Sequence, residues 1–227
     1  MPKINKDSTL NITFVGIGLC LLCSAIISFI AIQLRSVQEN NVVLDMQKKI
    51  VSSAGLDEVY GSVENAMSNI KTLIIDLDRG EIVDINPDTY ELSKELREDG
   101  KYKFLSAEED VASIKKREKY SKVYIEYKDN EINTLILPVR GYGLWGILYG
   151  YLAIEGDFNT VAGLEFYEHK ETPGLGAEID NPKWKALWKG KKIYQENGEV
   201  SLKVIKGSVM KTSDNLSLIH ISEPTRH

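Results

Sequence analysis

The chain has few of the side chains that commonly carry chemistry, with two cysteines and three histidines in 227 residues. Both cysteines, Cys20 and Cys23, lie in one uncharged apolar run, so the rest of the chain has no disulfide. Their C-x-x-C spacing is compatible with metal or redox chemistry, but no further ligand accompanies it. We therefore interpret them as small apolar residues of a helix.

The three histidines, His169, His220 and His227, complete neither a metal-ligand spacing nor a Ser-His-Asp set. No spacing marks two carboxylates as an acid and base pair. We predict no catalytic residue and no metal site, and we interpret His169, between Glu168 and Lys170, as a surface residue. The pattern is typical of a protein that binds a reactive group without supplying one.

Positive charge is also in deficit, since 28 Lys and Arg face 33 Asp and Glu and the net charge is -5. Lys3 and Lys6 stand near the N-terminus, so the remainder is more acidic still. This balance disfavours nucleic acid as a partner, because phosphate binding requires clustered Lys and Arg. It also disfavours docking on anionic lipid surfaces.

A long hydrophobic run, residues 12–34, contains no charged side chain. At about 1.5 Å per residue, a helix of this length spans roughly 35 Å, enough to cross a hydrocarbon core of about 30 Å. A cleaved secretory signal would have a shorter apolar region and end at a small-x-small site. Lys3 and Lys6 before the run, against Arg35 after it, favour a cytoplasmic N-terminus.

The chain beyond this run alternates short strand-like and helix-like segments. Hairpin patterns dominate, which predicts an α+β fold of mostly antiparallel sheets with short flanking helices. Strands are expected at 72–77, 81–85, 123–127, 134–139, 149–154, 161–167, 191–194 and 200–205, and helices at 37–51, 58–70, 88–98, 106–117 and 181–188. The predicted organisation is an N-terminus at 1–11, a transmembrane helix at 12–34, a helical stalk at 35–55, a folded domain at 56–213 and a tail at 214–227.

Two glycine-rich loops are candidates for binding. Gly141–Gly146 fits G-x-G-x-x-G, but a strand pattern follows it where a dinucleotide site needs a helix, so we reject a dinucleotide site here. Tyr142 and Trp145 give this loop aromatic faces, although core packing alone would also explain it. The second loop, Glu171–Gly176, contains a tight-turn pattern and offers backbone N–H groups to an anion or a heterocycle. Together the loops suggest a flat polar ligand.

The residues of these loops and their surroundings resemble NqrC, an FMN-binding family of subunits of the sodium-translocating NADH:quinone reductase. The resemblance runs from the apolar helix to about Gly207, and the string from Thr172 to Gly176 is specific to the family. Its further motifs are Pro138–Trp145, Leu148–Gly150, Asn159–Gly163, Phe166–Gly176 and Asn181–Trp184.

The resemblance implies a single-span subunit of a bacterial inner-membrane complex with a periplasmic domain. In the family this domain carries FMN, attached through its phosphate to a threonine, and relays electrons between NADH and ubiquinone as sodium is exported. The implied partners are the other subunits and a flavin transferase. The residues implied to form the flavin site are Trp145, beside the ring, and Glu171, Thr172, Leu175 and Gly176, which line the pocket.

One family motif has no counterpart here. The attachment string, Ser-Gly-Ala-Thr-x-Thr-Ser, should follow the last strand, but the chain reads Ser208–Asn215 and then continues to His227 without it. The stretch Leu216–His227 resembles a translated sequencing adapter, so we expect a truncated family domain with a non-native tail. Thr212 and Thr225 lie nearby without the motif, and neither is assigned the phosphoester.

Three alternatives stay open at this point. One is the related flavin-carrying G subunit of the electron-transport complex Rnf, against which the Asn181–Trp184 and Lys189–Lys192 strings favour NqrC. Another is a membrane-anchored extracytoplasmic sensor, which should have a second span and a cytoplasmic output domain. The third, a purely structural subunit, would not need the paired glycine-rich loops.

The missing string generates a first prediction. The chain expressed as written should show no flavin fluorescence on a denaturing gel, because no threonine stands in the attachment motif. A fluorescent band at the mass of the chain would refute this expectation.

Overall fold

The computed structural model describes residues 9–174, 176–206 and 218–221. The chain divides into two compact units between Asp45 and Met46. Helix α1 (Thr9–Ser53) occupies the described part of the first unit, and its last turns belong to the second. By length and composition α1 is able to cross a membrane, which agrees with the apolar run predicted at 12–34.

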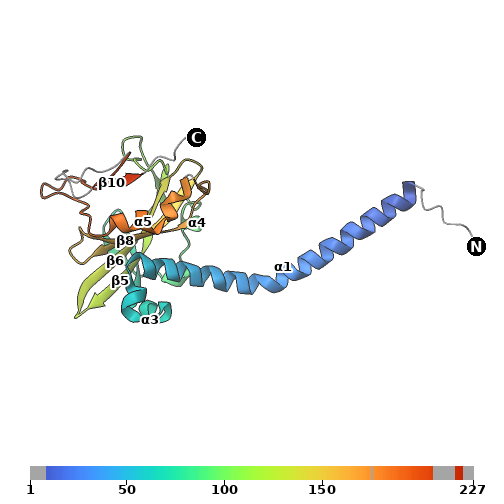
Figure 1. Cartoon of the computed structure of the whole chain (residues 1–227), viewed down its shortest axis with the longest axis horizontal. Coiled ribbons are helices and arrows are strands. Elements are labelled where there is room, and N and C mark those ends of the chain that lie inside the picture. Colours follow the sequence, from blue (N-terminus) through green and yellow to red (C-terminus); the bar gives the residue numbers. More distant parts are fainter. Residues whose placement is uncertain (1–8, 175, 207–217, 222–227) are drawn as a thin grey trace, which may run out of the picture. The chain divides into compact units, whose positions relative to one another are not determined.

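Within the described residues of the second unit, one six-stranded sheet has the order β2-β1-β5-β6-β7-β8, and every neighbouring pair is antiparallel. Figure 1 labels β5, β6 and β8 of this sheet. The predicted α+β class with mostly antiparallel sheets is confirmed. Asp129 and Asn130, both with positive φ, link β5 to β6, as a two-residue hairpin turn requires. The strands are β1 (Ile70–Asp76), β2 (Glu81–Val83), β5 (Tyr120–Lys128), β6 (Glu131–Tyr142), β7 (Ile147–Glu155) and β8 (Val161–Glu168).

Two further pairs of strands lie outside this sheet. β3 (Tyr102–Phe104) pairs antiparallel with β4 (Lys116–Glu118). β9 (Lys203–Lys206) pairs in parallel with β10 (Leu218–Ile221), which falls within the predicted tail. The strands expected at 191–194 and 200–205 are mostly isolated bridges, since Lys192 pairs with Thr160 and Tyr194 with Val200.

The helices after α1 are short. The helix expected at 58–70 is divided at Gly61, whose positive φ of 75° ends the first piece. At 181–188, Asn181 caps the helix as expected, accepting a hydrogen bond from Lys183 N at 3.0 Å. The helical elements are α2 (Leu56–Tyr60), α3 (Val63–Ser68), η1 (Pro87–Thr89), α4 (Leu92–Glu95), η2 (Gly176–Asp180), α5 (Pro182–Lys185) and η3 (Ala186–Trp188).

The prediction of a helix at 106–117 is wrong, although a capping box between Ser106 and Glu109 forms at its start. Ser106 N donates to Glu109 Oε2 at 3.1 Å, and Glu109 N donates to Ser106 Oγ at 3.3 Å. The chain then turns, because the Asp110 carboxylate accepts from the backbone N–H groups of Ile114 and Lys115 at 2.8 Å. These side-chain hydrogen bonds take the place of the backbone hydrogen bonds that would continue the helix, and the segment ends in β4.

Helices pack against both faces of the sheet. Consecutive residues of a strand point to opposite faces, so each strand can contribute side chains to both layers. On one face, Ile50 and Val51 of α1, Leu56 of α2 and Ala66 of α3 pack with strand residues that include Ile136. On the other face, Trp184 of α5 packs with Leu164 and with half-buried apolar residues of β6, β7, β8, η2 and η3. Each helical layer therefore fixes a different face of the same strands.

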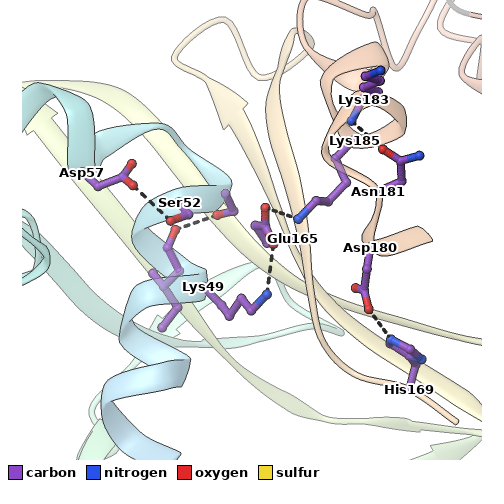
Figure 2. A network of polar contacts seen from close by, with 11 residues as sticks. Lys49, Ser52, Asp57, Glu165, His169, Asp180, Asn181, Lys183 and Lys185 are labelled. Carbon is purple, nitrogen blue, oxygen red and sulfur yellow. Dashed lines mark hydrogen bonds and ion pairs between the residues drawn. The ribbon is translucent and has the colours of Figure 1, made fainter. Parts of the chain in front are cut away.

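An ion cluster joins the two layers at the edge strand β8. Glu165 Oε2 lies 3.3 Å from Lys49 Nζ of α1, and Glu165 Oε1 lies 2.6 Å from Lys185 Nζ of α5 (Figure 2). The Glu165 and Lys185 side chains are largely buried, so water screens this pair less than it would an exposed one. The end of α1 is thus held to β8, and Gly163 allows the close approach, because a Cβ there would collide with the Ser53 carbonyl.

Tyrosine rings fill much of the face beneath α1. Tyr151 stacks on Tyr167 with ring centroids 4.9 Å apart and meets Tyr124 edge-on at 5.8 Å. Burial raises the pKa of Tyr124 to about 12, and burial also raises the pKa of Tyr151 and of Tyr167. These phenols therefore stay protonated at neutral pH, and the cluster adds no charge behind β7 and β8.

The core makes a stability prediction. Ile136→Ala should lower the free energy of unfolding by about 2–5 kcal/mol, because Ile136 is fully buried and its truncation leaves a cavity. Denaturant titration of the full chain in detergent, followed by far-UV circular dichroism, measures the loss of unfolding free energy. The matched control is Ile82→Ala on edge strand β2, where the side chain is 65% exposed and the change should stay within about 0.5 kcal/mol. Equal losses in the two variants would contradict the assigned core.

Candidate functional site

The two glycine-rich loops meet at one end of the sheet. The first is the turn between β6 and β7, closed by a hydrogen bond from Gly143 N to Gly146 O at 2.7 Å. The second directly follows β8. Trp145 N in the first loop donates to Glu171 Oε1 in the second at 3.1 Å. The structure therefore brings together segments that are 26 residues apart in sequence.

The Glu171 carboxylate lies between two glycines. A Cβ built on Gly143 would collide with Oε1, and one built on Gly176 would collide with Oε2. Glu171 is 8% exposed, so its charged group occupies space that side chains at these two positions would fill. Gly143 and Gly176, one in each loop, thus allow the close approach of one carboxylate.

The other predicted site residues differ in their exposure to solvent. The Trp145 residue is 63% exposed, and Tyr142 in the same loop is also exposed. Thr172 is exposed, and its carbonyl accepts from Ala177 N at 3.2 Å across the second loop. Gly174 has φ +75°, which favours glycine in the turn. Leu175 lies outside the described residues.

The base of the β6–β7 turn is fixed by a buried ion pair. Arg140 Nη2 lies 2.5 Å from Glu118 Oε2 and donates to the Lys116 carbonyl at 2.7 Å. Two residues further on, Tyr142 N donates to the Ala112 carbonyl at 2.8 Å. The turn that carries Trp145 is therefore supported by the segment before β5 as well as by Glu171.

His169 is not the surface residue predicted from its neighbours, because its side chain is 17% exposed. Its Nε2 lies 2.7 Å from Asp180 Oδ2, and its Nδ1 accepts from Glu171 N at 3.3 Å. The adjacent charges Glu168 and Lys170 suggested solvent exposure. The sequence carried no signal for the true environment, since Asp180 is 11 residues away and approaches only after η2 folds back.

A cavity lies at the opposite end of β6 and β7, away from the two loops. Its volume is about 390 Å³, and its lining includes Ala54, Asn133, Glu155 and Lys189. Most of its exposed wall is polar. In contrast to the Trp145 turn, the described residues that line this cavity include no aromatic side chain against which a flat ring could stack.

The residues at the Trp145 end fit a flat heterocyclic cofactor such as FMN. An exposed indole offers a stacking face, and Gly143 and Gly176 leave room for the Glu171 carboxylate between the two loops. Cofactor sites commonly combine an aromatic wall with a few fixed polar groups, and the Glu171 carboxylate and nearby backbone would supply such groups here.

Comparison with known proteins agrees with this geometry. The model of the FMN-binding domain family matches residues 143–214, which include the first loop from Gly143 onward and all of the second. The C subunit of the Na(+)-translocating NADH-quinone reductase of Pseudomonas aeruginosa is 46% identical over 210 residues, covering 90% of this chain and 80% of that protein. The corresponding subunit of Vibrio anguillarum is 40% identical over 211 residues, covering 93% and 83%.

Solved structures give the same result. The crystal structure of Shewanella oneidensis NqrC aligns with a TM-score of 0.70 at 28% identity, covering 79% of this chain and 83% of that one. The structure of the corresponding subunit from Parabacteroides distasonis aligns with a TM-score of 0.58 at 26% identity, covering 82% and 83%. These matches favour NqrC over the Rnf subunit and over a sensor domain. The chain belongs to the NqrC family of subunits of the Na(+)-translocating NADH-quinone reductase.

Proposed function

We propose that the chain is the flavin-carrying subunit of a sodium-translocating NADH:quinone reductase and that FMN binds at the Trp145 end of the sheet. The observation that carries this proposal is the buried Glu171 carboxylate, held between Gly143 and Gly176 beside an exposed indole. The proposed binding residues are Trp145, Glu171, Thr172 and Gly176, with Leu175 outside the described residues.

Bound FMN would supply the reversible electron chemistry that protein side chains lack, on the route from NADH to ubiquinone. The protein's task is to orient the ring and to limit its contact with water. Trp145 offers a face for stacking, and Glu171 holds the two loops at a fixed separation through Trp145 N. Both loops are anchored to strands of one sheet, which limits their movement.

The proposed membrane arrangement is a single span at 12–34 with the N-terminus in the cytoplasm and the domain, at about 56–213, in the periplasm. The lysines before the span and the apolar stretch of α1 support it. The other subunits of the complex are the proposed partners, and a flavin transferase would act in maturation. We propose that the described loops hold the ring, whereas covalent attachment through a threonine phosphoester requires the string that this sequence lacks.

The close approach at Gly143 generates a binding prediction. Gly143→Ala should weaken FMN binding to the full chain in detergent by about tenfold or more, because the new Cβ displaces Glu171 Oε1 and also lies 3.1 Å from Leu148 Cδ2. Titration of FMN, followed by quenching of its fluorescence, gives the dissociation constant.

Gly141→Ala is the matched control in the same loop. A Cβ there would meet its nearest atoms at 3.8 Å, an ordinary contact, so binding should change by less than about threefold. If the parent chain does not bind FMN, the proposed function is wrong. If the parent binds and both variants bind as well as it does, the ring lies elsewhere.

A further inference from the structure

The His169 ring connects the start of the second loop to the end of η2. On one side it meets Glu171 N, which begins the loop, at 3.3 Å from Nδ1. On the other side it meets Asp180 Oδ2, at the end of η2, at 2.7 Å from Nε2 (Figure 2). The residues between these contacts include Thr172 and Gly176, which the proposed flavin site requires.

The contacts assign the tautomer of His169. A backbone N–H only donates, so Nδ1 must present a lone pair to Glu171 N. The proton of the neutral ring then stands on Nε2, where it is donated to the Asp180 carboxylate. The ring is thus an acceptor toward the loop and a donor toward η2, and its low exposure limits replacement of either bond by water.

The same hydrogen-bonded series continues through Glu171. Its backbone N–H is bound by His169, and its side-chain Oε1 accepts from Trp145 N at 3.1 Å. Asp180, His169, Glu171 and Trp145 therefore link η2, the end of β8 and the β6–β7 turn in one continuous path. Glu171 has little freedom within it, because Gly143 and Gly176 approach its two carboxylate oxygens.

We propose that His169 is a positioning residue for the flavin site, acting through the acceptor at Nδ1 that fixes the backbone of Glu171. This inference rests on the proposed function. Without the acceptor, Glu171 N loses its partner, and the carboxylate is no longer aimed at Trp145 N. A site that is ordered before its ligand arrives binds more tightly than one that must be ordered on binding.

Two substitutions separate the two bonds of the ring. His169→Asn places an amide oxygen near the position of Nδ1 and removes the group that reaches Asp180. His169→Gln can reach Asp180 with an amide N–H but removes the acceptor near Glu171 N. The inference predicts that FMN binding to the full chain in detergent weakens about tenfold in His169→Gln and less than about threefold in His169→Asn.

A second readout needs no flavin. Amide hydrogen exchange at Glu171 should be faster in His169→Gln than in the parent and unchanged in His169→Asn, with equal thermal unfolding of both variants as the control for the fold. If the parent chain does not bind FMN, the proposed function fails, and the exchange measurement still decides the role of His169. If His169→Gln matches the parent in exchange and in binding, or if both variants lose binding equally, the positioning role is overturned.

Discussion

A buried carboxylate sets the geometry of the whole candidate site. Removing a charged group from water is costly unless donors and close packing compensate for the lost hydration. Glu171 obtains a donor from Trp145 N, and its oxygens fit only because positions 143 and 176 carry no Cβ. The β6–β7 turn, the loop after β8 and the start of η2 therefore converge on one side chain. A substitution that moves the backbone of any of these three segments should therefore shift the other two.

Ion pairs hold the strands from which the two loops emerge. Glu165 pairs with a lysine from each helical layer, which fixes the edge strand from which the Glu171 loop emerges. Arg140 and Glu118 fix the strand that leads into the Trp145 turn. Binding groups carried on loops that a rigid framework positions are common in proteins. Here two buried or half-buried ion clusters, one beneath each loop, provide that framework.

The sequence predicted the central sheet well because its signals are local. Short runs of apolar and aromatic residues, separated by polar or glycine-containing turns, identified the strands at β5 to β8, and the glycine spacing identified both loops. The errors share a different cause. The segment 106–117 has a capping box, but the Asp110 carboxylate binds the next turn and stops the helix. His169 looked exposed because its partner Asp180 comes close only in the folded chain.

The central claim is that a flavin ring binds between the two glycine-rich loops. A crystal structure of the full chain with FMN tests it most directly. We expect the isoalloxazine ring within about 4 Å of both Trp145 and the Glu171 loop. A ring bound instead in the cavity beside Asn133 and Lys189, with Glu171 and Trp145 free of it, would refute the proposed site.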